Sequence, residues 1–269
     1  MIKKFLFNLL IICAPFSTNA TILETRHIAN VIPLVDSETW FLVDLDNTLF
    51  EGAEAYGHAA WFYDAVNDGL EDGLSKEEII NIFYPRWIAS QKTCPVKPLE
   101  KEFISFITDL QNQGIVVMGF THRQPVIADS TIRQVNSLNI DFTLTAPSEE
   151  VFSLEAKNPT LYQNGILFVG DFNKKGEIFS KFLNHIDDAP NKIVFIDDKL
   201  KNVEEVESVA DRLGIPYTGV HYTAIDHAAP IYSREIAEEQ YRLYKEREAA
   251  ESVKDIWESW TVFTWTDDR

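Results

Sequence analysis

The chain has 269 residues, of which 45% are hydrophobic and 25% are charged, values ordinary for a globular protein. The formal net charge of −18 and the pI of about 4.7 argue against nucleic acid and against an anionic membrane surface as partners, because both attract Lys and Arg. A small phosphorylated substrate remains compatible with this charge, since one cation and a few lysines can reverse the field inside a single cleft.

Residues 1–20 have the three parts of a secretory signal. Lys3 and Lys4 precede an apolar stretch from Phe5 to Pro15, and small or polar residues lead to a cleavage point after Ala20. We therefore expect an exported bacterial protein, periplasmic or secreted, with no stable membrane insertion after cleavage, because the apolar stretch is short for a span. A buried N-terminal helix is the alternative. Loss of the two lysines would change the net charge from −18 to −20.

Apolar runs and helical periodicity alternate along the rest of the chain. Strands are predicted over Thr39–Asp46, Gly114–Thr121, Gly165–Asp171 and Lys192–Asp198, with a weaker candidate over Ile215–His221. Helices are predicted over Leu99–Gln113, Pro125–Leu138, Lys175–Ile186 and Leu200–Leu213. This alternation predicts an α/β fold with a doubly wound parallel sheet and helices on both faces.

Residues 50–114 are too many for a plain crossover, and we expect them to form a small helical cap between core segments 21–49 and 115–269. Cap helices are predicted near Glu54–Asp68 and Ser75–Tyr84. Candidate groups lining the entrance are Tyr56, His58, Trp61, Phe62, Arg86 and Trp87, although aromatic residues of this kind more often form the core of a cap than contact substrate. Residues 233–250 predict an exposed amphipathic helix, followed by aromatic residues that we expect to dock the tail.

The first candidate site is Asp44-Leu45-Asp46-Asn47-Thr48, at the end of a buried strand. Residues two apart in an extended chain share a face, so Asp44 and Asp46 can point into one cleft. Two carboxylates this close repel each other, and a hard cation such as Mg²⁺ relieves the repulsion while bridging to phosphate. One carboxylate can then act as the nucleophile and the other as the general acid or base.

Three further strand ends or helix starts carry polar residues. Thr121 could hold a phosphate oxygen or cap the following helix. Of the pair Lys174-Lys175 we prefer Lys175 as the ammonium group that neutralises phosphate and carboxylate. Asp197 and Asp198 end the fourth strand, and a metal is the simplest partner for such buried acids, with helix capping as the alternative for one of them.

The chain thus has a strand that ends in Asp44-Leu45-Asp46-Asn47-Thr48, a strand that ends in Thr121, Lys175 before a helix, and a strand that ends in Asp197-Asp198. These four elements, in this order, resemble the haloacid dehalogenase (HAD) superfamily over roughly Trp40 to Val220. The resemblance implies that Asp44 is the nucleophile, that Asp46 is the general acid/base, and that Thr121 and Lys175 bind the phosphoryl group. It also implies that Asp44, Asp197 and the main-chain carbonyl of Asp46 bind Mg²⁺. Asp198 and Asn202 would support these ligands.

Shorter matches narrow the resemblance further. Residues 118–123, 164–168, 175–177 and 221–223 resemble an uncharacterised family of secreted bacterial HAD-like proteins, the domain of unknown function 2608. Many of its relatives have a small residue where His122 stands, which leaves specificity beside Thr121 open.

The sequence thus predicts a Mg²⁺-dependent phosphomonoester hydrolase that forms an aspartyl phosphate on Asp44 and takes a small phosphorylated substrate. Asp46 favours this chemistry, because a dehalogenase needs no acid two residues after the nucleophile. A phosphomutase, a non-catalytic binding protein on a HAD scaffold, and a phosphatase effector delivered to a host cell are the alternatives. The substrate and the oligomeric state are not encoded in these patterns.

Overall fold

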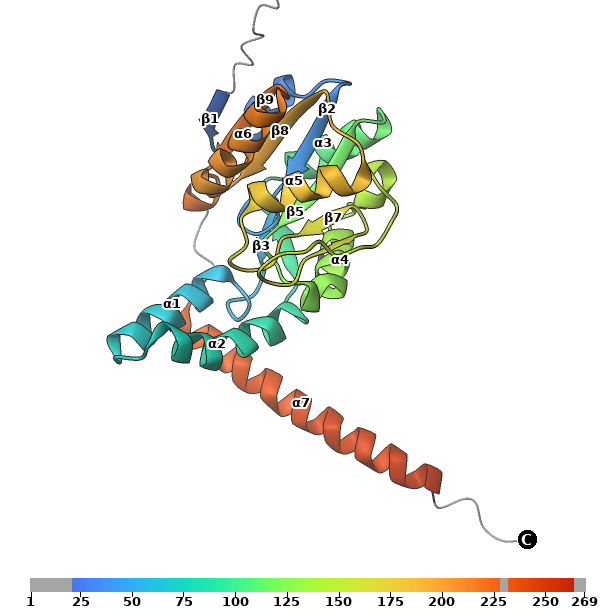
Figure 1. Cartoon of the computed structure of the whole chain (residues 1–269). Coiled ribbons are helices and arrows are strands. Elements are labelled where there is room, and N and C mark those ends of the chain that lie inside the picture. Colours follow the sequence, from blue (N-terminus) through green and yellow to red (C-terminus); the bar gives the residue numbers. More distant parts are fainter. Residues whose placement is uncertain (1–20, 228–231, 264–269) are drawn as a thin grey trace, which may run out of the picture.

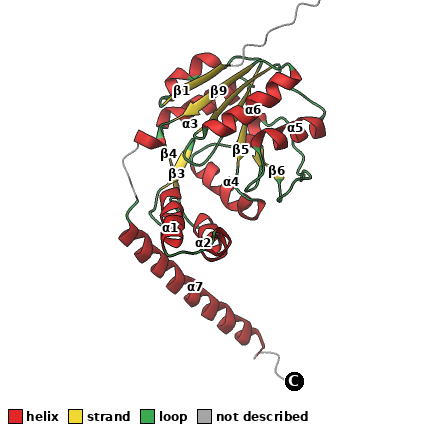
Figure 2. Ribbon diagram, turned by 60° about the vertical axis from the view of Figure 1, so that its left-hand side comes forward, coloured by secondary structure: helices red, strands yellow, loops and turns green. Residues whose placement is uncertain are grey.

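The computed structural model describes residues 21–227 and 232–263, with side chains described as far as residue 249. A seven-stranded sheet lies at its centre, in the order β1-β9-β8-β2-β5-β7-β6 (Figures 1 and 2). Its strands are β1 Thr21–Thr25, β2 Thr39–Val43, β5 Val116–Thr121, β6 Leu161–Gln163, β7 Ile166–Phe168, β8 Lys192–Asp197 and β9 Tyr217–Tyr222. Neighbouring strands are parallel except β6, which is antiparallel to β7. The predicted parallel α/β sheet is confirmed, with an antiparallel edge strand added.

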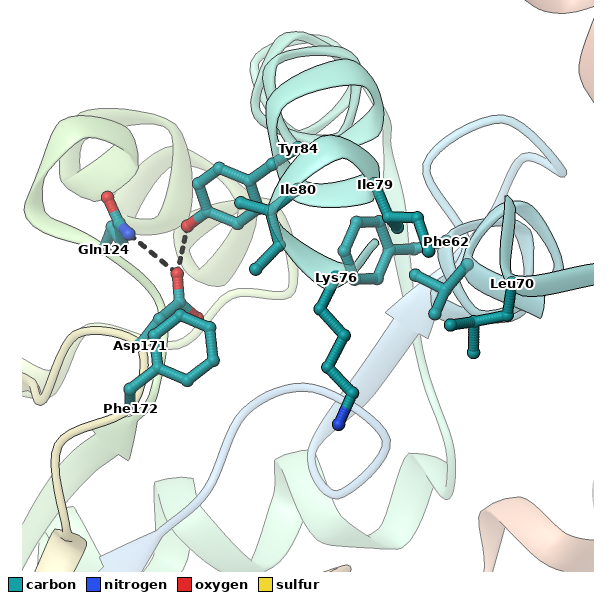
Figure 3. Close-up of a pocket in the computed structure, with 10 residues that line it drawn as sticks. Phe62, Leu70, Lys76, Ile79, Ile80, Tyr84, Gln124, Asp171 and Phe172 are labelled. Atoms are coloured by element: carbon teal, nitrogen blue, oxygen red, sulfur yellow. Dashed lines mark hydrogen bonds between the residues drawn. The ribbon is translucent and has the colours of Figure 1, made fainter. Parts of the chain in front are cut away.

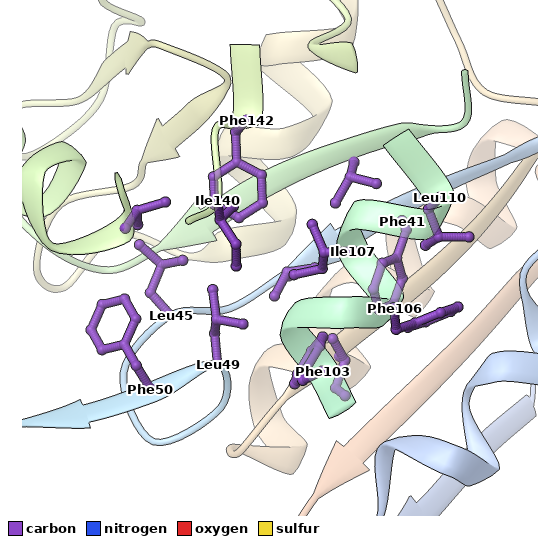
Figure 4. Close-up of a cluster of buried hydrophobic side chains, with 14 of the residues drawn as sticks. Phe41, Leu45, Leu49, Phe50, Phe103, Phe106, Ile107, Leu110, Ile140 and Phe142 are labelled. Atoms are coloured by element: carbon purple, nitrogen blue, oxygen red, sulfur yellow. The ribbon is translucent and has the colours of Figure 1, made fainter. Parts of the chain in front are cut away.

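Helices cover both faces of the sheet, which confirms the doubly wound arrangement. The covering helices are α3 Lys101–Asn112 and α4 Ala128–Ser137 on one face, and α5 Lys175–Ile186 and α6 Leu200–Leu213 on the other. Alternate side chains of β2 enter the two cores because a strand has a period of two. Phe41 packs with Phe103 and Phe106 of α3 (Figure 4), whereas Trp40 and Leu42 join the core with α5 and α6.

The predicted bounds of α5 and α6 are confirmed. Helix α6 ends at Gly214, whose φ of 70° is the left-handed conformation that glycine adopts readily at a helix end. Strand β1 was not predicted; it is a polar edge strand that pairs only with β9. The strand predicted over Gly165–Asp171 is shorter, because Gly170 and Phe172 both turn the chain with positive φ. Short 3₁₀ helices lie at Ile28–Asn30, Ile32–Leu34, Pro125–Ile127, Phe142–Thr145 and Ile225–His227.

Two helices and a small antiparallel ladder separate β2 from α3. The elements are β3 Phe50–Gly52, α1 Ala59–Glu71, α2 Lys76–Gln91 and β4 Val96–Pro98, with β3 paired to β4. Ser75 and Glu78 form a capping box that starts α2. Helix α2 runs beyond the predicted end at Tyr84, so Trp87 lies within it. Helices α1 and α2 lie beyond the sheet (Figure 1), whereas α3, also in the range 50–114, packs against it.

The C-terminal helix α7, Arg234–Phe263, begins against α1 (Figure 2). Arg234 forms ion pairs with Asp64 at 2.7 Å and Asp68 at 2.8 Å, and Ala237 is buried with Trp61. The predicted amphipathic helix is therefore present and mostly exposed, and its first turns pack one face against α1. The aromatic side chains that were predicted to dock the tail lie outside the described residues. The predicted signal at residues 1–20 also lies outside them. Among the described residues, no helix is both long and apolar enough to span a membrane.

Candidate active site

The candidate site residues gather at the carboxyl edge of the sheet. Asp44 directly follows β2, Thr121 ends β5, Asp197 ends β8, and Lys175 is the first residue of α5. The chain runs from β2 outward to β5 and β7, and then returns to build β8 and β9 on the other side of β2. The crevice beside such a reversal is where open α/β sheets bind ligands.

Lys175 is the centre of this cluster and is 0% exposed. Its ammonium Nζ lies 2.6 Å from Asp44 Oδ1, 2.6 Å from Asp197 Oδ2 and 2.6 Å from the carbonyl oxygen of Phe120. Burial alone would lower the pKa of Lys175, but the carboxylates of Asp197 and Asp44 outweigh it and hold the pKa above its ordinary value. Lys175 therefore carries a positive charge between two acids. Lys174 is the exposed N-cap residue and stays outside the cluster.

Asp197 is fully buried and held by two donors besides Lys175 Nζ, through three hydrogen bonds. Asn202 Nδ2 donates to both carboxylate oxygens, at 2.9 and 3.0 Å, and the backbone N–H of Lys199 donates to Oδ1 at 2.8 Å. The N-cap residue of α6 is Lys199, so neither Asp197 nor Asp198 is the N-cap residue of this helix. These contacts fix the orientation of the Asp197 carboxylate.

A hydroxyl links the first and last predicted motifs. Thr48 Oγ1 donates to Asp44 Oδ2 at 3.0 Å and accepts the backbone N–H of Asp198 at 2.9 Å. Thr48 belongs to the first sequence motif, but the sequence analysis gave it no role. Its position four residues after Asp44 is the one feature of the sequence that could have indicated this contact. Burial raises the pKa of Asp44 well above its ordinary range; Lys175 opposes that shift, and the charges of Asp197 and Asp198 add to it.

The acids at this edge fit a divalent cation. Asp44, Asp197 and Asp198 each offer a carboxylate oxygen, and these oxygens all lie within 4.8 Å of one another. Lys175 neutralises one of the three negative charges, and Lys199 lies 2.9 Å from Asp198 Oδ2. An all-oxygen set with residual negative charge suits a hard divalent cation. This cluster includes the side chain of Asp198, which was predicted only to support the site.

Asp46 is held by an arginine whose role the sequence did not reveal. Arg123 donates from Nε to Asp46 Oδ2 and from Nη2 to Asp46 Oδ1, both at 2.7 Å, in a bidentate pair. The guanidinium is buried, and it also donates to Gln91, Thr131 and Gln134. Arg123 therefore does not face solvent, but it lies in the wall of a pocket that also contains Asp46. The side chain of Asp46 remains 35% exposed.

Thr121 is buried at the end of β5, and its hydroxyl accepts the backbone N–H of Arg123 at 3.1 Å. It does not cap the next helix, because Gln124 occupies that N-cap position. His122 Nε2 lies 3.1 Å from the carbonyl oxygen of Asn173. Burial and the charge of Lys175 lower the pKa of His122 to about 4, so its imidazole is neutral at pH 7.

The profile of the family described as "Protein of unknown function (DUF2608)" matches residues 21–252. The chain belongs to this family. A "Putative outer membrane protein" of Chlamydia muridarum is 33% identical over 244 residues, covering 88% of this chain and 91% of the relative. An uncharacterised protein of Rickettsia prowazekii is 26% identical over 239 residues, covering 82% and 84%.

Among solved structures, this DUF2608 chain is similar to a class C acid phosphatase from Bacillus anthracis with tungstate bound. The two are 13% identical, with a TM-score of 0.36 and coverage of 81% of this chain and 82% of the other. A similarity at this level does not bear on the function of the chain.

A pocket of about 200 Å³ leads away from Asp46 in this DUF2608 protein. Phe62 and Trp87, two of the predicted lining residues, lie in its wall. Asp171 also lines it and accepts hydrogen bonds from Tyr84 and Gln124, which were not among the predicted residues. Burial raises the pKa of Asp171 above its ordinary value.

The other predicted lining residues lie elsewhere. Tyr56 and Trp61 pack edge to face in the contact with α7, and His58 pairs with Glu51 at 3.0 Å. Arg86 lies over the ring of Tyr241, 4.9 Å from its centroid. These four residues therefore hold the cap region together instead of lining the pocket beside Asp46.

Proposed function

We propose that this protein is a Mg²⁺-dependent phosphomonoester hydrolase in which Asp44 accepts the phosphoryl group. The observation that carries the proposal is the Lys175 ammonium, 2.6 Å from both Asp44 and Asp197 at the carboxyl edge of the sheet. A buried cation aimed at a carboxylate nucleophile neutralises charge where a phosphoryl group would bind. The order of the four motifs along the chain, which resembles the HAD superfamily, supports the same reading.

In the proposed reaction, Thr121 and Lys175 bind the oxygens of the phosphoryl group. A carboxylate oxygen of Asp44 attacks phosphorus in line, so that a new P–O bond forms and the bond to the leaving oxygen breaks. Thr48, which donates to Asp44 Oδ2, leaves the other oxygen of that carboxylate facing Lys175. The product of this step is an aspartyl phosphate on Asp44 and a free alcohol.

Asp46 is the proposed general acid/base. It protonates the leaving oxygen and then takes a proton from the water that attacks the aspartyl phosphate and releases inorganic phosphate. Both oxygens of Asp46 accept one hydrogen bond from Arg123, and each oxygen keeps a second lone pair that can carry the proton. The partial exposure of Asp46 toward the pocket gives the leaving group access to it.

Asp44, Asp197 and Asp198 are the side chains that would hold Mg²⁺, with the main-chain carbonyl of Asp46 as a further ligand implied by the family resemblance. A bound Mg²⁺ would neutralise the negative charge of the phosphoryl group and of its carboxylate surroundings. Asn202 and the backbone of Lys199 would keep Asp197 oriented in this role.

We also propose that the protein is exported. The pattern of residues 1–20 supports this, and the names of the chlamydial relatives are in keeping with it. The N-terminal sequence of the protein recovered from a periplasmic fraction tests it. A chain that begins after Ala20 is the expected result, and an intact chain confined to the cytoplasm would contradict export.

The decisive experiment is hydrolysis of an aryl phosphate by the purified protein, with Mg²⁺ or with chelator, beside the Asp44→Asn variant. We expect activity that needs the metal and falls more than about 1000-fold in Asp44→Asn, because the nucleophile is lost. Asp109→Asn is the matched control, since it makes the same change at an exposed position on α3. Near-normal turnover by Asp44→Asn would exclude the proposed nucleophile.

An inactive wild type that binds Mg²⁺ and phosphate would instead favour a non-catalytic binding protein on the same scaffold. Activity restricted to phosphoproteins or phosphoinositides would favour the effector alternative over a small substrate. Both alternatives are thus outcomes of the same assay with a wider set of phosphate esters.

A further inference from the structure

A larger pocket, of about 500 Å³, lies between the cap helices and the loop after β7 (Figure 3). Its wall comes from α1, α2, Gln124 and residues 171–172, and consists of Phe62, Val66, Leu70, Lys76, Ile79, Ile80, Tyr84, Gln124, Asp171 and Phe172. Six of these residues have wholly apolar side chains. Figure 3 shows the ammonium of Lys76 extending away from Ile79 and Phe62, so this residue contributes its aliphatic stem to the wall.

The polar groups of the pocket are concentrated at one end and are bonded to one another. Tyr84 and Gln124 both donate to Asp171 Oδ2, the latter at 2.8 Å. The remaining wall offers few hydrogen-bond partners to a sugar or a nucleobase. A polar occupant would lose its bonds to water there without replacement, whereas an apolar occupant would lose nothing.

This apolar pocket adjoins the pocket that contains Asp46. The two share Phe62, Tyr84, Gln124 and Asp171 in their walls. Asp46 is the proposed proton donor to the leaving oxygen, so the leaving group has to lie on its side of the site. A leaving group that passes Asp46 therefore enters the apolar pocket next.

Three of the six apolar side chains of the wall are exposed. Phe172 is 75% exposed, Leu70 is 47% exposed and Ile80 is 37% exposed. Phe172 also has a φ of 62°, a left-handed conformation that is unfavourable for a bulky side chain. Strain of this kind is concentrated at ligand sites, where function and not packing accounts for it.

We propose that the natural substrate is the phosphate monoester of an apolar alcohol, with the hydrocarbon part of the leaving group seated in this pocket. This inference rests on the proposed function and adds the class of substrate to it. Hydrocarbon bound there would cover Leu70, Ile80 and Phe172 and would be flanked by Tyr84 near the reacting phosphate.

The test is kcat/KM for the series butyl, hexyl and octyl phosphate, below micelle-forming concentrations. We expect kcat/KM to rise by up to about fourfold for each added methylene group as the chain fills the pocket. Ile80→Asp, which places a charge in the wall, should flatten this rise. Ile82→Asp is the matched control, because Ile82 is 44% exposed on the same helix but outside the pocket, and it should keep the rise.

A second variant and a second measurement distinguish loss of the pocket from misfolding and from loss of turnover. Phe172→Gly removes part of the wall while relieving the left-handed φ, so we expect a folded protein with a weaker dependence on chain length. Calorimetric binding of butyl-, hexyl- and octylphosphonate to the wild type gives the same comparison without hydrolysis. If the affinity for the phosphonates rises with chain length but none of the phosphate esters is hydrolysed, the pocket assignment stands and the proposed phosphatase activity is refuted. Chain-length independence in both measurements would overturn the apolar substrate alone.

Discussion

Replacement of Lys175 by Met tests whether its ammonium group holds the site together. Methionine has nearly the length of lysine but no charge, so the change leaves the carboxylates of Asp44 and Asp197 buried without their shared cation. Removing one partner of a buried ion pair typically costs about 3–5 kcal/mol of unfolding free energy. For a chain of this size, that corresponds to a fall in Tm of roughly 10 °C.

Lys174→Met is the matched control, because it makes the same substitution one residue earlier at an exposed position. Thermal unfolding in chelator should separate the two variants, with Lys174→Met close to the wild type. Adding Asp44→Asn to Lys175→Met should recover part of the lost stability, because one of the two uncompensated charges disappears. Phosphatase activity of Lys175→Met should fall by at least about 100-fold, in line with the loss of one donor to a developing anion.

Equal Tm values for Lys174→Met and Lys175→Met would refute this reasoning. That result would mean that Asp44 and Asp197 do not depend on the ammonium for their burial. Equal activities of the two variants would separately remove Lys175 from the proposed phosphate site.

Two further changes probe the surroundings of the site. Arg123→Gln should cost about 2–4 kcal/mol of unfolding free energy, because buried acceptors such as Gln134 lose their donor, and denaturant unfolding beside the exposed Arg133→Gln control would show it. The pKa of His122 is about 4 in the folded chain, against an ordinary value of 6.5. As the pH drops from 6.5 to 4, the unfolded chain is therefore protonated at His122 before the folded chain is, and the free energy of unfolding falls. His122→Gln should remove about 3 kcal/mol of that fall, measured in chelator, and an unchanged pH profile would show that the imidazole is not excluded from protonation.

Most of the core could be predicted because its strands are buried on both faces. Such strands read as continuous apolar runs, as in Trp40 to Val43, and their ends are marked by the first polar residue. Parallel strands bring these ends to one edge, so Asp44, Thr121 and Asp197 could be placed together without coordinates. The sequence analysis preferred Lys175 to Lys174, and the structure places Lys175 in the cluster.

Other features depend on contacts between distant segments and carry no local pattern. Arg123 reads as an ordinary polar residue after a strand, yet it binds Asp46, 77 residues away. Asp171 looked like the end of a strand, but it meets Tyr84 of the cap region. Strand β1 has too little apolar character to stand out, because an edge strand has one neighbour and partial exposure.

The α/β class, the order of the main elements and the residues that share the carboxyl edge of the sheet could all be predicted from the sequence. Burial sets the periodicity of apolar residues, and this periodicity is visible along the chain. The side chains that touch Asp46 and the space that the cap region encloses are set by tertiary packing. Those outcomes follow from how α1, α2 and the loop at Phe172 pack across the edge, and packing between segments far apart in sequence leaves no local signal.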